Sequence, residues 1–565
     1  MIQINSDTLI AIENHFRVSA GPGAGKTYWL VEHIKNVLHH STRLEKTRKV
    51  ACITYTNIAV ETILNRLGTS TEQVEVSTIH SFLYKNIVKP YAAFLVDDYG
   101  LKVAEIDGHD DIILSNYSFL REWKAKTRQQ RITDDKLLVK AFRAIRWKFD
   151  DSGDLVVKPD YPQRVGGYNI KNDSYFEYKK MAWGKAVIHH DDVLFFSYQL
   201  IKKHPFIIQV LQSKFPYFFV DEFQDTNPIQ VAILKLIGER ETIVGIIGDE
   251  AQSIYGFQGA EPQQFGSFML HNIEEYEMAD NRRSTNQIID VLNLVRVDLV
   301  QNKYRNVNGE IPVIIVGEMI TALKKATEMS NNEPIYSLSR INITSNAMKK
   351  EVGGTSFNDK LIEELSDKDK SSNNNGYRSK VVIACLKATE YARERNFKNA
   401  IKELERIFKD KDDEDKGKKE ALRHICLLLK KYEEFKDKPL FDFYSIVKNE
   451  IKSDISRLAS GAAKTFYEGH SYQQLALCVK IVEDVSRHKT IHKAKGDEFE
   501  NVLLILTEES DLSFLLNPDL KGIPEEHRIN YVAVSRAIKR LFINIPSLPK
   551  GNLSILGSIF NIVRV

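Results

Sequence analysis

The most informative segment of the sequence is RVSAGPGAGKT at Arg17–Thr27. A short strand runs here into a glycine-rich turn, and the apolar residues of the following YWLVEHIKNVL recur at helical spacing. A glycine-rich turn between a strand and a helix is the context in which such a loop binds phosphate. The sequence therefore predicts a phosphate-binding loop rather than a plain glycine turn.

Each residue type in this loop has a chemical task. Glycines allow backbone amides to curl around an anion, and the N-terminus of the following helix adds its dipole. The Lys26 ammonium would reach the β- and γ-phosphates of a nucleotide, and the Thr27 hydroxyl would bind Mg²⁺. Ala20 stands where the strict pattern has glycine. We expect nucleotide contacts from Ala20, Gly21, Gly23, Ala24, Gly25, Lys26 and Thr27.

A second signal is the stretch FPYFFVDEFQD at Phe215–Asp225. Its apolar run is typical of a buried parallel strand, and two carboxylates follow where ligand sites of open α/β sheets lie. Asp221 would hold Mg²⁺ through water, and Glu222 would orient and deprotonate an attacking water. An apolar strand that ends in Asp-Glu is commonplace alone. Together with the phosphate loop it predicts an ATP hydrolysis site.

A third apolar run, TIVGIIGD, ends at Asp249 and leads into EAQSIYGFQGA. Gln252 follows this strand, where its amide could sense the γ-phosphate. Gln252 therefore joins Lys26, Asp221 and Glu222 as a candidate catalytic residue.

Composition sets wider limits. The chain has 565 residues, enough for about three or four domains at roughly 150 residues each. Apolar residues at 43% and charged residues at 27% exclude a wholly disordered chain. The 79 Lys and Arg residues nearly balance the 76 Asp and Glu residues. A nucleic-acid binder of this composition would have to concentrate its positive charge locally.

Cysteine usage and hydropathy favour a cytoplasmic protein. The four cysteines are scattered without a CxxC pair, so we expect neither a zinc site nor a disulfide framework. The N-terminal residues lack the basic start and apolar core of a signal peptide. No run of 18 apolar residues occurs, so we expect no membrane span and no membrane partner.

These residues carry a resemblance that runs through almost the whole chain. The chain resembles the UvrD/Rep/PcrA family of superfamily 1 DNA helicases. Beyond the phosphate loop, the matching segments follow in the family's order: ITYTNIAVETILNRL (Ile53–Leu67), VSTIHSF (Val76–Phe82), VDEFQDTNPIQ (Val220–Gln230), GDEAQSIYGFQGA (Gly248–Ala260), ADNRRST (Ala279–Thr285), TIHKAKGDEFENVLLI (Thr490–Ile505) and NYVAVSRAIKRLFI (Asn530–Ile543).

The resemblance implies an α/β fold with two RecA-like P-loop motor domains on parallel sheets, each carrying a mainly helical insertion. The expected parts are residues 1–90 and 185–270 for the first motor domain, 91–184 for its insertion, 271–345 and 485–565 for the second motor domain, and 346–484 for its insertion. Strands are expected at Lys49–Thr54, Tyr217–Val220, Ile311–Val316, Ile335–Leu338, Val502–Leu506 and Leu541–Ile545.

The resemblance also implies further site residues. Arg283 and Arg536 match two arginine fingers of the second motor domain, and Glu498 matches a residue that contacts the ribose. ATP and Mg²⁺ are the implied cofactors. Single-stranded DNA and its junction with duplex are the implied partners. Stacking or backbone contacts with DNA are expected from Thr54, Tyr55, Asn57, His80, Tyr255, Phe257 and His492.

Tyr55 replaces the phenylalanine that is usual in the family and keeps a stacking ring. Three other residues also depart from the family pattern. Arg282 stands where a tyrosine usually stacks on adenine, Gln258 replaces a common arginine, and Asp497 replaces a leucine. The family's adenine-reading glutamine motif has no clear counterpart, because the surroundings of Gln3 do not match it. The strictness of ATP over GTP therefore stays open.

Three other segments have a composition that suggests a role. Arg121–Lys148 is rich in Lys and Arg and contains Trp123, Phe142 and Trp147. It is either a solvated helical face or a surface that touches duplex or the junction strand. The run His189–Asp192 is read as a helix cap rather than a metal site. The polar stretch Ser366–Lys380 is expected to be a loop.

Two functions follow from these expectations. The first is an ATP-dependent DNA helicase or translocase that moves 3′→5′ on single-stranded DNA and hydrolyses Mg-ATP at the interface of its motor domains. The alternative is a DNA-activated ATPase subunit or sensor that partners a nuclease, without processive unwinding. Compact UvrD-like proteins occur with nucleases in bacterial antiphage defence systems, which suits the size of this chain. A nucleotide-binding structural protein fits poorly, because Glu222 and both candidate fingers are present.

Overall fold

The computed structural model describes residues 1–106, 112–354, 357–370, 373–408, 414–481, 486–521 and 525–565. Contacts divide the chain into two compact units, each of which is described by itself. The first unit comprises Met1–Ser284, Leu292–Val307 and Asp519–Tyr531. The second unit comprises Thr285–Val291, Asn308–Pro518 and Val532–Val565.

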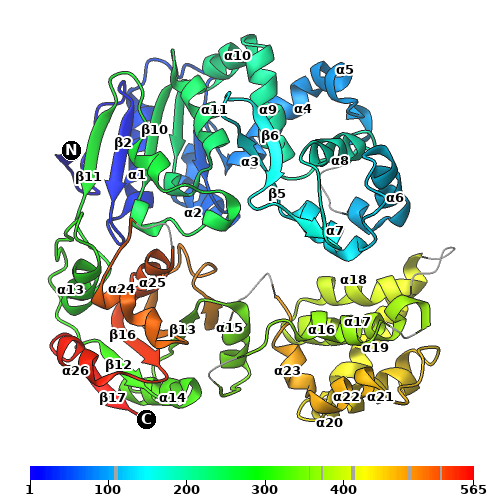
Figure 1. Ribbon diagram of the computed structural model, residues 1–565. Helices are drawn as coiled ribbons and strands as arrows, with labels where there is room; N and C mark the ends of the chain where they lie inside the picture. Colours follow the sequence, from blue (N-terminus) through cyan, green and yellow to red (C-terminus); the bar gives the residue numbers. More distant parts are fainter. Residues whose placement is uncertain (107–111, 355–356, 371–372, 409–413, 482–485, 522–524) are drawn as a thin grey trace. The chain divides into compact units, whose positions relative to one another are not determined.

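A seven-stranded sheet organises the first unit, and all its neighbouring strands pair in parallel. Figure 1 shows the sheet with the phosphate-loop strand β2 beside β10. In spatial order the strands are β1 (Ile2–Gln3), β11 (Glu274–Met278), β2 (Phe16–Ala20), β10 (Ile243–Gly248), β9 (Tyr217–Val220), β3 (Val50–Thr54) and β4 (Val74–Thr78).

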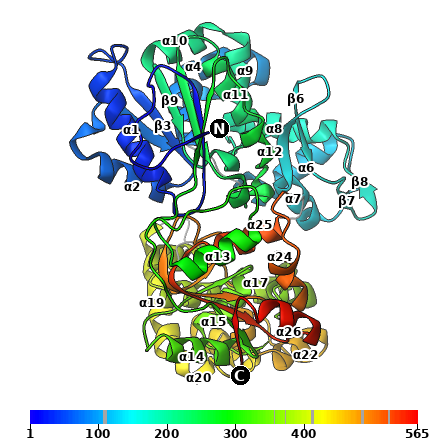
Figure 2. The same ribbon diagram turned by 90° about the vertical axis from the view of Figure 1, so that its left-hand side faces the viewer.

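Both faces of this sheet are buried, which explains why its strands are apolar without alternation. Val50 and Cys52 face one core, and Ala51 and Ile53 face the other, because successive side chains of a strand point to opposite faces. Figure 2 shows α1 and α2 on one side and α9 and α11 on the other. The covering helices are α1 (Lys26–His40), α2 (Asn57–Leu67), α9 (Asp192–Lys203), α10 (Phe206–Lys214) and α11 (Pro228–Gly238).

The insertion of the first unit contains two small antiparallel hairpins as well as helices. Trp123, Phe142 and Trp147 are buried here, so the aromatic residues of the basic stretch pack inward and form no exposed face. The stretch also ends in strand β5 rather than a helix. Helices α3 (Ile79–Leu83) and α4 (Lys89–Tyr91) lead into the insertion, whose elements are α5 (Val96–Tyr99), α6 (Tyr117–Lys126), α7 (Asp135–Arg143), β5 (Ile145–Phe149), β6 (Leu155–Pro159), β7 (Arg164–Val165), β8 (Tyr168–Asn169) and α8 (Asp173–Trp183).

The second unit is built on a six-stranded sheet that is also entirely parallel between neighbours. In spatial order its strands are β14 (His488–Thr490), β13 (Tyr336–Ser339), β15 (Phe499–Ile505), β16 (Ala537–Ile545), β12 (Val313–Val316) and β17 (Asn561–Arg564). Helices near this sheet in sequence are α14 (Met319–Met329), α15 (Asn342–Lys349), α24 (Ser513–Leu516) and α26 (Lys550–Leu556).

A helical insertion with its own apolar core completes the second unit. The prediction of a loop at Ser366–Lys380 is wrong, because α16 and α17 occupy most of this stretch. Asp369 and Arg378 form a buried ion pair that satisfies its charges. The helices are α16 (Leu361–Lys368), α17 (Asn373–Arg393), α18 (Phe397–Phe408), α19 (Glu414–Lys430), α20 (Tyr432–Phe435), α21 (Leu440–Ile446), α22 (Ala462–Gly469) and α23 (Tyr472–Ala476).

Two parallel-sheet units confirm the predicted α/β class with two RecA-like domains. Residues 271–284, which we expected in the second motor domain, instead supply β11 to the first sheet. The other predicted domain boundaries stay predictions. Three helices remain: α12 (Gln263–Gly266), α13 (Asn286–Val295) and α25 (Glu526–Val534). Helices α13 and α25 each contain residues assigned to both units. Among the described residues, no helix is long and apolar enough to cross a membrane.

Candidate nucleotide and DNA sites

The predicted phosphate loop joins β2 to α1 in the first unit. Gly23 and Gly25 have φ angles of +74° and +85°, in the left-handed region that favours glycine. A Cβ at Gly23 would lie 2.7 Å from Oδ1 of Asn281, so a larger residue would collide there. The Gly21 N–H donates to the Met278 carbonyl at 3.1 Å, which ties the loop to β11.

Lys26 and Glu222 lie in the same site. Helix α1 begins at Lys26, and Nζ of this lysine is 4.0 Å from Oε1 of Glu222. Glu222 follows β9 and has φ +53°, a left-handed conformation that is uncommon for a residue with a side chain. Its N–H donates to Asp221 Oδ1 at 3.0 Å, while the Asp221 N–H donates to the Ile53 carbonyl at 2.8 Å. These hydrogen bonds fix the backbone of the turn after β9, from which the Asp221 and Glu222 side chains extend.

The groups near this turn suit a magnesium ion. Mg²⁺ prefers oxygen ligands and is usually held by one or two carboxylates together with substrate phosphates. Asp221 is a 4% exposed carboxylate at the end of β9, and Thr27 offers a hydroxyl at the second position of α1. These donors fit the ion that the sequence predicts.

The next strand, β10, brings Gln252 to the same edge of the sheet. Its Nε2 donates to Asp249 Oδ2 at 2.6 Å, and the amide is buried. Asp249 also forms a buried ion pair with Arg296 at 2.7 Å. Burial opposes the charge of Arg296, but Asp249 beside it raises the pKa of the guanidinium above its usual range. This pair fixes Asp249 and, through it, Gln252.

Arg283 lies beside the phosphate loop in the first unit. A Cβ at Gly23 would lie 3.0 Å from the Arg283 Cβ, and the Arg283 N–H donates to Asn281 Oδ1 at 2.9 Å. We expected this arginine on the second motor domain, and its contacts place it with the first. Asn281 is buried and links to Gln301, whose Nε2 donates to the Pro22 carbonyl at 2.9 Å.

Three other predicted residues, Arg536, Glu498 and His492, lie in the second unit. The Arg536 side chain is buried, with Nη2 donating to Ser535 Oγ at 2.8 Å and Nη1 donating to the Asp497 carbonyl at 3.4 Å. Glu498, next to Asp497, is exposed. The Asp497 carboxylate pairs with Lys489 at 2.9 Å, which explains how this unit accommodates a charge where leucine is usual. His492 is half-buried in the same unit.

Three aromatic rings of the first unit form a connected cluster at the carboxyl edge of its sheet. Tyr55 stacks on Tyr255 with centroids 4.6 Å apart, and Tyr255 lies 5.9 Å from Phe257. The Tyr55 hydroxyl donates to Gln258 Oε1. Burial and then Asp225 raise the pKa of Tyr55 well above its usual range, so its hydroxyl stays protonated. Phe257 is 58% exposed, which leaves its ring open to a ligand.

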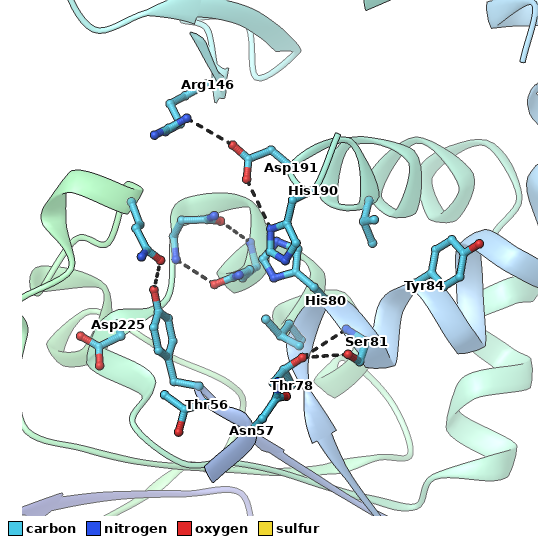
Figure 3. A pocket seen from close by; sticks show the side chains of 16 residues that line it. Thr56, Asn57, Thr78, His80, Ser81, Tyr84, Arg146, His190, Asp191 and Asp225 are labelled. Carbon is cyan, nitrogen blue, oxygen red and sulfur yellow. Dashed lines mark hydrogen bonds and ion pairs between the residues drawn. The ribbon is translucent and has the colours of Figure 1, made fainter. Parts of the chain in front are cut away.

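Two cavities of about 790 Å³ and 480 Å³ adjoin this cluster and share Arg146, Asp191, Asn227 and Gln258. Figure 3 shows the larger cavity, which Tyr55, Asn57 and His80 line, while Phe257 lines the smaller one. Thr54 is buried at the end of β3, and neither it nor Tyr255 lines either cavity. His492 belongs to the second unit and is not among the residues that line either cavity.

The sequence predicts a DNA contact for His80 and a helix cap for the run that contains His190 and Asp191, yet all three residues line the larger cavity. His80 and His190 are 110 positions apart, yet their rings lie 3.7 Å apart between centroids, beside Asp191 (Figure 3). The ligand atoms of these three residues lie within 4.8 Å of one another, a spacing that could hold a metal ion. The only signal in the sequence was the run His189–Asp192. Asp191 is the N-cap residue of α9 without a side-chain capping bond.

Asp192 of α9 connects the insertion to the rest of the first unit. Its carboxylate is fully buried and accepts hydrogen bonds from the indoles of Trp147 and Trp183, both at 2.9 Å. Lys179 Nζ lies 2.7 Å from Oδ1, and the His189 N–H donates at 2.9 Å. Burial favours protonation of Asp192, but Lys179 and His189 outweigh it and hold the pKa well below its usual range.

The sheet, loop and carboxylates define the class as a P-loop α/β protein with two motor-type units. Residues 3–272 match the UvrD/REP helicase N-terminal domain, and residues 356–547 match the UvrD-like helicase C-terminal domain. These two matches together cover most of the chain. The chain belongs to the UvrD/REP helicase family.

Similar known proteins agree with this assignment. Gabija protein GajB of Bacillus cereus (strain HuB5-5) is 27% identical over 333 residues, which cover 50% of this chain and 47% of GajB. Putative ATP-dependent DNA helicase YjcD of Bacillus subtilis (strain 168) is 23% identical over 97% of this chain and 80% of YjcD. ATP-dependent DNA helicase PcrA of the same strain is 26% identical over 51% of this chain and 38% of PcrA. The alignments with GajB and PcrA thus span less than half of those proteins.

Proposed function

We propose that this protein is an ATP-dependent DNA helicase or translocase that moves 3′→5′ along single-stranded DNA. The observation that carries this proposal is the approach of Lys26 Nζ to within 4.0 Å of Glu222 Oε1 beside the glycine loop. A phosphate-binding cation and a candidate base occupy one site, at the carboxyl ends of strands that lie close together in the sheet. Family membership supports the same activity.

The residues divide the work of hydrolysis between them. Lys26 and the loop amides bind the β- and γ-phosphates, and Glu222 accepts the proton of the attacking water. Thr27 and Asp221 would hold Mg²⁺, which neutralises charge that develops on the phosphate oxygens. Arg283 beside the loop is a further cation for that charge.

The aromatic cluster supports a grip on single-stranded DNA. Stacking of bases on aromatic rings tolerates any sequence, because every base has a π-face. Phe257 is exposed at the smaller cavity, and Tyr55 lines the larger one beside His80. We propose that the strand runs along these two adjoining cavities, with Arg146 near its phosphates.

Two assays test this proposal. ATP hydrolysis is measured with and without single-stranded DNA, and strand displacement is measured on a 3′-tailed duplex and a 5′-tailed control. Stimulated hydrolysis with displacement of the 3′-tailed duplex alone supports the motor. Displacement of only the 5′-tailed duplex contradicts the polarity. An absence of hydrolysis in the wild type, equal to that of Lys26→Ala, contradicts the activity itself.

A second candidate is a DNA-activated ATPase subunit that partners a nuclease, and the similarity to Gabija protein GajB is compatible with it. Hydrolysis that DNA stimulates without displacement of either duplex would support this candidate. A nuclease encoded beside this gene would then be the partner to add to the assay. Processive displacement by the chain alone would count against it.

A further inference from the structure

Two histidines and an aspartate meet at one wall of the larger cavity. His80 belongs to α3, whereas His190 and Asp191 directly precede α9. The two imidazole rings lie 3.7 Å apart between centroids, and the ligand atoms of all three residues lie within 4.8 Å of one another. Within the described part of the chain, no other group of three His, Cys, Asp or Glu side chains is spaced to hold a metal ion.

The backbone beneath these side chains is fixed by the core of the first unit. Ile79, next to His80, and Val193, two residues after Asp191, belong to one buried apolar cluster. Helices α3 and α9 also pack against each other. The histidines are far apart in the sequence, but they therefore extend from rigid elements that lie side by side, which is the support that a ligand site needs.

The Asp191 carboxylate directs one oxygen to the histidines and the other to Arg146 (Figure 3). Its Oδ1 lies 3.9 Å from Nδ1 of His190, and its Oδ2 lies 3.8 Å from Nη1 of Arg146. A helix cap does not account for this side chain, because it makes no capping hydrogen bond to α9. A second partner that orients a ligating carboxylate is a common feature of metal sites.

The adjacent His189 makes different contacts and does not line the cavity. Its Nε2 lies 2.7 Å from the Tyr178 hydroxyl, and its Nδ1 lies 3.3 Å from Oδ2 of the buried Asp192. The two neighbouring histidines therefore have separate roles. His189 holds the core carboxylate, and His190 is exposed at the cavity with Asp191.

This donor set suits zinc. Two imidazole nitrogens and a carboxylate oxygen are typical of zinc sites that keep a further position for water or a substrate. Imidazole also favours zinc over Mg²⁺, which prefers oxygen ligands. Ligands at about 2.0–2.1 Å from zinc lie about 3.3 Å apart in a tetrahedron. Side-chain rotations that move each ligand atom by about 1 Å close the present spacing to that value.

The cavity leaves the fourth position of such an ion accessible. Tyr55 and Asn57 line the same cavity of about 790 Å³, along which we place the single strand. A bound cation is often the largest local charge in a site, and a phosphate oxygen is an anionic ligand that is able to replace its water.

We propose that His80, His190 and Asp191 bind one Zn²⁺ ion, whose open coordination position takes a phosphate oxygen of single-stranded DNA. The phosphate contact rests on the proposed function, because it requires DNA in this cavity. The metal site itself requires neither DNA binding nor ATP hydrolysis. The ion would add a sequence-independent contact to the DNA site.

The first test measures zinc binding by the full-length protein without DNA or nucleotide. The protein is treated with a chelator and titrated calorimetrically with ZnCl₂ in excess Mg²⁺, which saturates oxygen-rich sites such as that of Asp221. One zinc ion should bind per chain, and His190→Asn and Asp191→Asn should each weaken binding by at least about tenfold. His40→Asn changes an exposed histidine outside the cavity and should bind zinc as the wild type does.

Two further readouts separate a metal site from a structural role. Chelator-treated His190→Asn should melt at the wild-type temperature, because this side chain is exposed, and only the wild type should be stabilised by added zinc. Co²⁺ should give the visible absorption of a four-coordinate site in the wild type and not in His190→Asn. An absence of zinc binding, or equal binding by wild type and His190→Asn, would overturn the site.

The second test measures the affinity for a labelled oligothymidine by fluorescence anisotropy, with and without one equivalent of Zn²⁺. Zinc should strengthen wild-type binding by about threefold or more, because one more phosphate charge is neutralised, and should leave His190→Asn unchanged. His80 is not varied in this assay because it is itself a predicted DNA contact. Unchanged or weaker DNA binding by the zinc-bound wild type would overturn the phosphate contact. If no DNA binds under any condition, the proposed function fails, and the calorimetry still decides the metal site.

Discussion

The Tyr55 hydroxyl donates a hydrogen bond to Oε1 of Gln258 across 203 positions of sequence. Each of these residues replaces the one usual in the family, a phenylalanine and an arginine, and the two replacements meet in one hydrogen bond. The bond fixes the edge of the Tyr55 ring while its face stacks on Tyr255. The ring and the hydroxyl of Tyr55 therefore make different contacts, and their roles can be tested separately.

Tyr55→Ala should weaken binding of single-stranded DNA by about 5- to 150-fold, because a stacked base contributes about 1–3 kcal/mol. Tyr55→Phe keeps the ring and loses only the bond to Gln258, which is worth about 1 kcal/mol. Its affinity should stay within about fivefold of wild type. Fluorescence anisotropy of a labelled oligothymidine measures both. Equal losses in the two variants would show that the hydroxyl, not the ring, binds DNA.

Lys26→Ala should abolish ATP turnover while circular dichroism and the melting temperature stay near wild type. The Lys26 ammonium lies 4.0 Å from Oε1 of Glu222, within the site that the glycine loop forms. Glu222→Gln keeps the shape of the side chain and removes the base, so kcat should fall by about 10²- to 10⁴-fold with nucleotide binding retained. Turnover that survives in Lys26→Ala would mean that the loop is not the nucleotide site.

Phe257→Ala should reduce DNA-stimulated hydrolysis more than basal hydrolysis, because its exposed ring lies at the smaller cavity rather than at the phosphate loop. Phe206→Ala is the matched control, since this ring is also exposed in the first unit but lines neither DNA cavity. Steady-state ATPase rates over a titration of single-stranded DNA distinguish the cases. A proportional loss of both rates in Phe257→Ala would argue against stacking.

Asp192→Ala should destabilise the first unit by about 3–5 kcal/mol at pH 7, because Lys179 is left as a buried charge without its partner. The native pKa of Asp192 is lowered, so its carboxylate stabilises the fold above the ordinary carboxyl pKa of about 4. That contribution is lost as the pH falls below this value. Tryptophan fluorescence in urea reports on this unit, which contains all four tryptophans.

The pH series provides the control for this prediction. Between about pH 5 and pH 3, wild-type stability should fall more steeply than that of Asp192→Asn, which cannot titrate. Burial opposes the charge of Asp191, but a hydrogen bond from His190 and the charge of Arg146 hold the pKa of its carboxyl below its usual range, so Asp191→Asn should flatten the curve as well. Parallel curves for wild type and Asp192→Asn would show that the buried carboxylate does not titrate in this range.

Local patterns were enough to predict much of this fold. The strand Tyr217–Val220 occurs at its predicted bounds, and Val50–Thr54 begins one residue later than predicted. Both are continuous apolar runs that end beside polar residues, which is the pattern of a parallel strand buried on two faces. The phosphate loop was equally visible, since strand, glycines and helix are contiguous in the chain.

Other features depend on contacts that no local pattern contains. The approach of His190 to His80 is a consequence of where α9 packs, and the bond between Tyr55 and Gln258 joins segments that follow separate strands. Basic residues around Trp123 and Phe142 suggested a binding face, but the rings are buried. Amphipathic segments carry charge on one side and a core on the other, so composition alone did not distinguish them.

The core of the first unit limits how this chain can be cut and rejoined. One apolar cluster contains Ile53 and Val220 of the sheet together with Trp123 and Trp183 of the insertion. The carboxylate that anchors those indoles belongs to α9, which lies outside the inserted residues. The insertion therefore cannot be removed as an independent module. A minimal motor domain made by deleting it would expose part of its hydrophobic core to water. A chimera that takes the insertion from a relative would also have to include α9 of that relative.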